Sequence, residues 1–394
     1  MRLDSETVSG RGRGARFALL VGLVVCVVVV GMGTAGATAV WSIVSNPNPA
    51  GSTSSALFGV ACPSTTSCDA VGNYVSGAVQ KPLAKRWNGS KWMVVASPNP
   101  SGSFDASLYG VACPSIKSCT AVGYYSSGAA TRPLIEHWNG VQWKIVPGAT
   151  ATGLLDGIAC ASATNCNAVG NYNLAGARAL AEHWNGTKWT VVPTPNPLLT
   201  TLSAVACTSV TSCTAVGTDS VEGTLVLHWN GIKWTRQTSP NPPVSATSSL
   251  FGVACITATN CEAVGAYTWT SARRGFIEHW NGTNWAIVTT PNPTGANSGL
   301  GGVACASAAL CNAVGYYTVG TVTKSLVLQR NGIKWSIVAS PNPKGATQTI
   351  LNAVACASTP TCNGQHGNPT VTDAVGQSGP ALAPTSTSLI ERYG

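Results

Sequence analysis

Cysteine pairs are the most regular reactive groups in the sequence. A cysteine recurs every 47 to 51 residues, and each has a partner six positions further along the chain. Zinc coordination is the alternative chemistry, but zinc sites use shorter spacings and a second ligand pair that the repeats lack. The spacing therefore predicts seven local structural disulfides, namely Cys62–Cys68, Cys113–Cys119, Cys160–Cys166, Cys207–Cys213, Cys255–Cys261, Cys305–Cys311 and Cys356–Cys362.

Glutamate and histidine are adjacent in three repeats, at Glu136-His137, Glu182-His183 and Glu278-His279. A carboxylate beside an imidazole could perform acid–base catalysis. Adjacent residues of a strand point to opposite faces of a sheet, however, and the pairs recur in different repeats. We therefore expect structural hydrogen bonding here, and we predict no catalytic residue, no metal site and no cofactor.

Four strand-like segments make up each repeat. In the second repeat they are Leu108–Cys113, Cys119–Tyr125, Leu134–Trp138 and Trp143–Val146. The first two form a hairpin between the cysteines, and the last two meet at Asn139-Gly140, a strong turn signal. Helical periodicity is absent from the repeats. Four strands in each of seven repeats predict an all-β, seven-bladed β-propeller over residues 40–394.

The two ends of the repeat array are complementary. The seventh repeat contains only the first three strands, Ile350–Cys356, Asp373–Gly376 and Ser388–Tyr393. An extra copy of the fourth strand, Trp41–Val44, precedes the first repeat. We expect this N-terminal strand to complete the last blade and close the propeller. The alternative is a string of small disulfide domains, each of which would be marginally stable alone.

The N-terminal segment has the features of an export signal. Four arginines precede an apolar run over residues 17–30, and Ala37-Thr38-Ala39 fits a signal-peptidase site. Residues 1–39 are therefore predicted to be a signal peptide. A retained membrane anchor is the alternative, although the run is short for a span of about 20 residues. We expect a secreted or cell-surface protein in a compartment that permits disulfides.

Charged residues make up only 9% of the chain, and the net charge of +9 comes from scattered lysines and arginines. Since they form no basic stripe, we expect no nucleic-acid partner. Membrane contact is expected only through an uncleaved N-terminal segment. We expect the protein to be a monomer.

The segment A-V-G-x-Y, followed by W-N-G-x-x-W-x-I-V-x-x-P, resembles the kelch type of propeller repeat. Gly123, Trp138 and Trp143 occupy places comparable to the glycines and aromatic residues of kelch repeats. The cysteine-stapled form looks like secreted repeat proteins of Gram-positive bacteria. Kelch-type propellers are binding scaffolds and, more rarely, enzymes such as copper oxidases. The copper-ligand set has no match here, so the resemblance implies the fold and an extracellular setting but no activity.

Positions that differ between otherwise similar repeats are candidates for ligand binding. One such position lies in the first strand and would lie near the mouth of the central channel, on the variable-loop face: Phe58, Tyr109, Asp156, Ser203, Phe251, Gly301 and Asn352. A second set begins the variable loops, where aromatic rings would suit saccharides or extended peptides: Tyr74, Tyr125, Tyr172, Tyr267, Trp269 and Tyr317. Solvation is the alternative role for the first set, and burial between blades is the alternative for the second.

These features favour a non-catalytic extracellular binding or scaffold protein, with a glycan or protein ligand on the variable-loop face. One alternative is a propeller enzyme that acts on glycans as a hydrolase or lyase. Such an enzyme needs convergent carboxylates, whereas Asp156 is the only carboxylate of the first set. A purely structural envelope protein is a further alternative.

Overall fold

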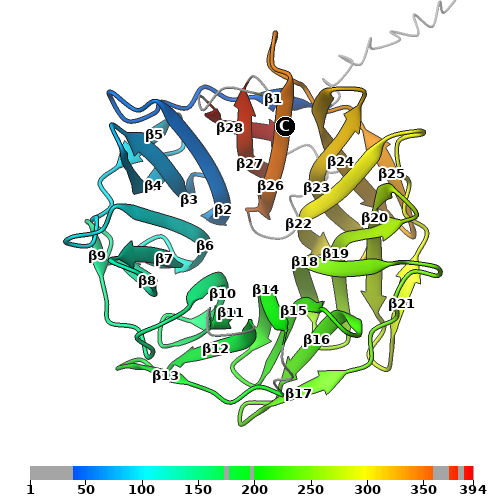
Figure 1. The fold of residues 1–394 in the computed structure, drawn as a ribbon, viewed down its shortest axis with the longest axis horizontal. Helices are drawn as coiled ribbons and strands as arrows, with labels where there is room; N and C mark the ends of the chain where they lie inside the picture. Colours follow the sequence, from blue (N-terminus) through cyan, green and yellow to red (C-terminus); the bar gives the residue numbers. More distant parts are fainter. Residues whose placement is uncertain (1–38, 173–176, 196–198, 358–371, 380–385, 394) are drawn as a thin grey trace, which may run out of the picture. The chain divides into compact units, whose positions relative to one another are not determined.

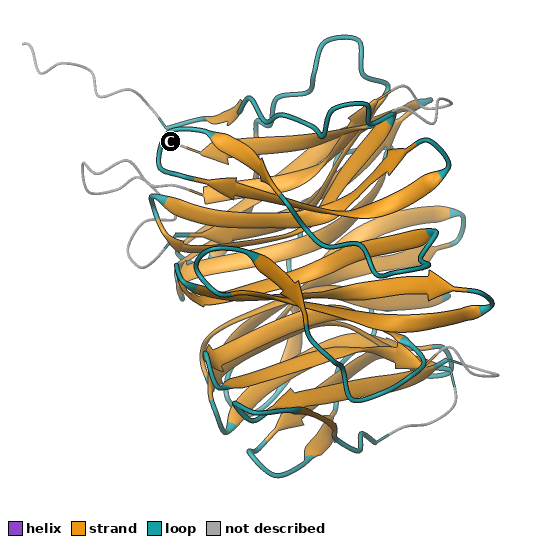
Figure 2. Ribbon diagram, turned by 90° about the vertical axis from the view of Figure 1, so that its left-hand side faces the viewer, coloured by secondary structure: helices purple, strands orange, loops and turns teal. Residues whose placement is uncertain are grey.

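The computed structural model describes residues 39–172, 177–195, 199–357, 372–379 and 386–393. The predicted signal peptide, apart from Ala39, and Cys362 of the seventh predicted disulfide lie outside these residues. All described residues belong to one compact unit, Ala39–Gly394. They form 28 strands and no helix, which confirms the all-β prediction (Figure 2). The described part of the chain accordingly contains no helix able to cross a membrane.

The first two repeats form one sheet of eight strands, composed of two antiparallel groups of four. Group 1 is β2 (Ser54–Ser64), β3 (Ser67–Ser76), β4 (Val79–Trp87) and β5 (Trp92–Val95). Group 2 is β6 (Asp105–Ser115), β7 (Ser118–Ser127), β8 (Ala130–Trp138) and β9 (Trp143–Ile145). A single parallel bridge, Gln80 to Asp105, joins the groups. The four strands predicted for the second repeat are present, and the first three are longer than predicted.

The next three repeats each form a separate antiparallel sheet of four strands. Group 3 is β10 (Leu154–Ser162), β11 (Asn165–Tyr172), β12 (Arg178–Trp184) and β13 (Trp189–Val191). Group 4 is β14 (Thr200–Ser209), β15 (Ser212–Asp219), β16 (Gly223–Trp229) and β17 (Trp234–Gln237). Group 5 is β18 (Thr247–Thr257), β19 (Asn260–Trp269), β20 (Ala272–Trp280) and β21 (Trp285–Val288).

The last sheet combines the C-terminal repeats with the N-terminal strand. Group 6 is β22 (Asn297–Ser307), β23 (Leu310–Val319), β24 (Val322–Asn331) and β25 (Lys334–Val338). Group 7 is β26 (Gln348–Cys356), β27 (Thr372–Gly379), β28 (Thr387–Tyr393) and β1 (Trp41–Ile43). β1 pairs antiparallel with β28, so that Trp41 lies opposite Tyr393. The first strand of the described chain therefore lies beside the last.

The first strand of every group lies toward the centre of the arrangement (Figure 1), namely β2, β6, β10, β14, β18, β22 and β26. β2 contacts both β6 and β26. Small residues permit this close approach: a Cβ on Gly59 would lie 2.7 Å from the carbonyl oxygen of Tyr109, and one on Gly302 would lie 2.9 Å from the Cα of Ala353. The first strands are therefore the innermost strands of the described chain.

The hydrophobic core lies between successive groups. One cluster joins Leu57 and Trp92 of group 1 to Val375 and Ile390 of group 7. Trp92 is 1% exposed, and the equivalent tryptophans of the other groups are also buried. The clusters show that the repeated tryptophans pack between neighbouring groups, where large aromatic rings contribute much of the buried apolar area.

Local disulfides hold the first hairpin of six groups. They join Cys62–Cys68, Cys113–Cys119, Cys160–Cys166, Cys207–Cys213, Cys255–Cys261 and Cys305–Cys311, with the Cα atoms of each pair 4.0 Å apart. These six predicted disulfides are confirmed. Each pair closes the turn between the first and second strands, so each stiffens its own group and does not link one group to another.

Candidate functional site

A β-bulge recurs in the first strand of each group, at the variable position singled out from the sequence. In group 1 the pairing register shifts between Leu57 and Gly59, which leaves Phe58 as the extra residue. The same shift isolates Tyr109, Asp156, Ser203, Phe251, Gly301 and Asn352 in the other groups. A bulge redirects a side chain without ending the strand, and bulges are frequent beside functional sites.

All seven bulge residues line one central cavity of about 230 Å³. A hydrophobic ring lies next to them, formed by the residue two positions further along each strand: Val60, Val111, Ile158, Val205, Val253, Val303 and Val354. The bulge residues are half-buried, whereas all seven residues of the hydrophobic ring are buried. The structure thus brings the first predicted set of residues together at one place.

Two aromatic rings meet on one side of this cavity, and a third, Phe251, lines it from group 5. Phe58 and Tyr109 meet edge to face, with their ring centroids 5.3 Å apart. Tyr109 in turn lies 5.6 Å from the ring of Tyr124. Burial, and then the neighbouring Tyr124 and Asp156, raise the pKa of the Tyr109 hydroxyl, so it is a neutral hydrogen-bonding group at neutral pH.

Polar groups occupy other parts of the lining. Burial raises the pKa of the Asp156 carboxyl to about 7, while a hydrogen bond from Asn171 acts in the opposite direction. The Asn352 side-chain amide donates to the carbonyl oxygen of Leu57 at 2.8 Å, which fixes its orientation across the β26–β2 junction. The Arg273 guanidinium lies 5.5 Å from the ring centroid of Phe251. Aromatic, acidic and amide groups are therefore distributed asymmetrically in the cavity lining.

A hydrogen-bonded network extends from Tyr109 toward the variable loops, and sequence reasoning missed it. The Tyr124 hydroxyl donates to Asp105 Oδ1 at 3.0 Å, and Gln80 Nε2 donates to the same oxygen at 2.6 Å. Tyr124 follows the glycine of A-V-G-x-Y, one position before the tyrosines that the sequence singled out. The variation at this position, where Asn171 lies in group 3, was the available signal.

The second predicted set does not line the central cavity. Its tyrosines are half-buried and pack against the hydrophobic clusters between groups, namely Tyr74, Tyr125, Tyr172, Tyr267 and Tyr317. Trp269, at the end of β19, is 45% exposed. The structure therefore places the tyrosines of this set between neighbouring groups, and Trp269 is the one member of the set whose ring is exposed to solvent.

The adjacent glutamates and histidines point to opposite faces of their strand. Glu136 accepts hydrogen bonds from the Ser97 hydroxyl, with both carboxylate oxygens 2.9 Å from Ser97 Oγ. The neighbouring His137 faces Thr120, with His137 Nδ1 3.3 Å from Thr120 Oγ1. The two side chains therefore do not form an acid–base pair.

Two clusters of sulfur and carboxylate atoms have the spacing of metal ligands. Asp373 Oδ2 lies 3.3 Å from Cys68 Sγ, and Asp69 Oδ2 lies 3.4 Å from Cys119 Sγ. Both cysteines are in disulfides, so they offer no thiolate to a metal. Each carboxylate also pairs with an arginine, Arg392 or Arg86. These clusters pack one group against the disulfide of the next.

Comparison with known proteins gives similarity at the level of structure alone. No family profile matches the sequence, and no curated protein sequence matches it. The structure described as YCF48 bound to D1 peptide has a TM-score of 0.54 and 12% identity, covering 90% of this chain and 96% of that chain. YCF48 from Cyanidioschyzon merolae has a TM-score of 0.50 and 12% identity, covering 90% and 98%.

A GH74 xyloglucanase from Xanthomonas campestris has a TM-score of 0.55 and 11% identity, covering 89% of this chain but only 55% of that chain. These neighbours are β-propellers. At such identities the similarity concerns the fold and not the site. Together with the sheets described above, it shows that the chain is a β-propeller.

Proposed function

We propose that residues 40–394 form a closed, seven-bladed propeller of the kelch-like type that acts outside the cell as a non-catalytic binding protein. Support for closure comes from the pairing of β1 with β28 and from the contact of β26 with β2. Lys85 adds to it, because its ammonium donates to Asn46 and Asn48 of the N-terminal segment and to Ser388 of β28. The disulfides support an extracellular setting.

The ligand of the central cavity, in this proposal, is the terminal sugar of a glycan. The observation that carries it is the ring of bulged residues, which brings one variable residue from every group to a common cavity. Phe58 and Tyr109 supply apolar ring surface for the face of a sugar, while Asp156 and Ser203 supply hydrogen-bonding groups for its hydroxyls. A cavity of about 230 Å³ is smaller than most ligand pockets, which measure about 300–1,000 Å³, so we match it to a single sugar residue.

A glycan array followed by calorimetric titration tests this proposal. Replacing Tyr109 with alanine should weaken binding at least about tenfold, since an aromatic contact and a hydroxyl are lost together. Val141→Ala is the matched control, because Val141 is 79% exposed in a turn of β8–β9 and does not line the cavity. Glycan binding that Tyr109→Ala and Phe58→Ala both leave unchanged would refute the cavity as the site.

A glycan-active enzyme is the second candidate, favoured by the place of Asp156: this residue lines the cavity, and a carboxyl pKa that burial raises to about 7 would let it act as a general acid near neutral pH. Glycoside hydrolysis by the usual route needs a second carboxylate. Asp105, which like Asp156 acts electrostatically on Tyr109, accepts hydrogen bonds from Tyr124 and Gln80. Release of reducing sugar that is lost in Asp156→Asn would establish the enzyme; binding without release supports the binding protein.

A further inference from the structure

The hairpin between β15 and β16 is shorter than its counterparts. Gly217 and Leu225 are eight positions apart, whereas the equivalent Gly123 and Leu134 of group 2 are eleven apart. The chain turns at Gly223, whose φ is 95°, and β16 begins there. β16 therefore lacks the extended residues with which β4 and β24 begin.

At other junctions those extended residues lie beside the first strand of the following group. The Gln80 amide of β4 donates to the carbonyl oxygen of Phe104 at 3.2 Å, just before β6. The Thr323 amide of β24 donates in the same way to Thr347 at 2.9 Å, just before β26. Both acceptors lie four positions before the leucine of the first strand. The equivalent residue in group 5 is Ala246.

A second backbone group of the first strand also takes part in these junctions. The Ser55 amide donates to the carbonyl oxygen of Ser386 at 2.8 Å, and the Gly153 amide donates to that of Thr131 at 3.1 Å. Both donors lie two positions before the leucine of the first strand. The equivalent donor in group 5 is the amide of Ser248.

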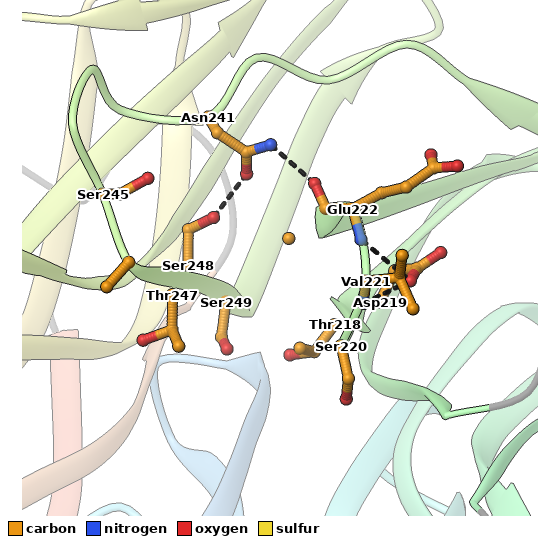
Figure 3. A pocket seen from close by; sticks show the side chains of 12 residues that line it. Thr218, Asp219, Ser220, Val221, Glu222, Asn241, Ser245, Thr247, Ser248 and Ser249 are labelled. Atoms are coloured by element: carbon orange, nitrogen blue, oxygen red, sulfur yellow. Dashed lines mark hydrogen bonds between the residues drawn. The ribbon is translucent and has the colours of Figure 1, made fainter.

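Within the described ranges of the chain no strand pairing joins β16 to β18, and the amide of Glu222, which is equivalent to Gln80 and Thr323, donates to Asp219 Oδ1 at 3.1 Å. The Asn241 side chain crosses this junction, since Nδ2 donates to the Glu222 carbonyl oxygen at 2.6 Å and Oδ1 accepts from Ser248 Oγ, much as Asn292 accepts from Ser298 Oγ at the next junction. A pocket of about 390 Å³ remains beside this bridge (Figure 3), lined by residues 218–223 on one side and by residues 245–249 on the other. We call it the junction notch.

Charge at the junction notch is slightly negative. Arg236 pairs with Asp219 at 2.9 Å and with Glu222 at 2.9 Å, so two carboxylates face one guanidinium. Glu222 is 68% exposed and can accept a second cation. A basic side chain on an incoming segment would therefore be favoured here.

We propose that the junction notch binds a short extended peptide of a partner protein, which pairs parallel to the beginning of β18. The peptide takes the place that β4 and β24 fill at their own junctions: one amide donates to the Ala246 carbonyl oxygen, and one carbonyl oxygen accepts from the Ser248 amide. Strand addition of this kind uses backbone groups for affinity and neighbouring side chains for selectivity. A lysine or arginine of the peptide pairs with Glu222.

The probe is a capped, fluorescein-labelled peptide that copies residues 320–326, the segment that fills the equivalent place beside β26. It contains Thr323, whose amide supplies the parallel hydrogen bond in group 6, and Lys324. Titration with the intact chain should give saturable anisotropy, and hydrogen exchange should slow at residues 246–249. The same peptide with an N-methyl group on the Thr323 amide should bind about tenfold more weakly, because a single hydrogen bond is lost.

A matched protein variant fills the junction notch with the chain's own strand. Replacing residues 219–223 with residues 317–324 restores the hairpin length of group 6 and should abolish peptide binding. Tyr109→Ala, in the central cavity, should leave peptide binding unchanged, so this test is independent of the proposed glycan site. The proposal is overturned if the peptide does not bind at millimolar concentration, if N-methylation has no effect, or if the filled variant binds as the original chain does.

Discussion

Replacing Glu136 with glutamine should reduce the pH dependence of stability. The Glu136 side chain is fully buried on β8, and its described partner is the uncharged Ser97 hydroxyl. Burial raises the pKa of this carboxyl from 4.5 to about 8, and the Ser97 hydrogen bond opposes the rise. The folded protein therefore retains a proton that the unfolded chain has released above pH 4.5.

The sign of the effect follows from proton binding. Between the two pKa values the folded state binds more protons than the unfolded state, so the free energy of unfolding falls as pH rises. For Glu136 alone the loss between pH 5 and pH 7 is on the order of 3 kcal/mol. Glu278, with a pKa of about 8, adds a loss of the same sign. Burial lowers the pKa of Lys85 to about 7. Its contribution to the free energy of unfolding therefore has the opposite pH dependence, and this contribution appears only at higher pH.

Denaturant unfolding followed by tryptophan fluorescence measures this loss at pH 5 and pH 7. Glu136→Gln should lose less stability over this interval than the original chain, by on the order of 3 kcal/mol. Val141→Ala is the control, since that side chain is uncharged and 79% exposed, so its replacement should leave the pH dependence unchanged. An identical pH dependence in Glu136→Gln and the original chain would refute the reasoning.

Two further predictions concern backbone positions. Val244 has a φ of 56° in a turn where the loop after group 1 has Gly102. Val244→Gly should therefore stabilise the chain by about 1 kcal/mol, and Gly102→Val should destabilise it. Denaturant midpoints measure both effects, and unchanged midpoints would contradict this prediction. A Cβ on Gly123 would lie 2.0 Å from the carbonyl oxygen of Ser107, so Gly123→Ala should cost about 3 kcal/mol. Gly128→Ala, in an open turn, should cost less, and equal losses would argue against the clash.

Much of the fold could be predicted because the repeats act as an internal alignment. Strand pairing within a group follows from hairpin turns and alternation, and the pairing of β1 with β28 follows from the phase of the repeat. The strand Trp41–Val44 is a fourth strand without the other three, and the last repeat has three strands without a fourth. Edge strands with unpaired backbone groups favour such pairing.

The site could be predicted only in part, because bulges leave no clear signal in the sequence. Variation at Phe58 and its equivalents marked the position, but the register shift that directs these side chains into one cavity depends on how neighbouring strands pack. For the same reason Tyr125 was proposed as a contact, whereas Tyr124 joins the network beside the cavity. Both lie on β7, and strand alternation alone does not show which face meets the cavity.

The shortened β15–β16 hairpin was visible in the sequence, but its consequence was not. Repeat spacing shows the missing residues between Gly217 and Leu225. Only the hydrogen bonds of the other junctions show that such residues normally pair with the next group. A deletion therefore marks a possible site only when the structure shows what the deleted segment would have contacted.

The spatial proximity of Trp41 and Tyr393 tests the closure of the propeller most directly. Their ring centroids are 5.6 Å apart, and the Val44 amide donates to the carbonyl oxygen of Ile390 at 2.9 Å. Nuclear Overhauser spectroscopy of the chain, with selectively labelled tryptophan and tyrosine, should give a cross-peak between these two rings that Trp41→Ala removes. Absence of that cross-peak in the folded protein, with unprotected amides at residues 41–44, would contradict the closed propeller.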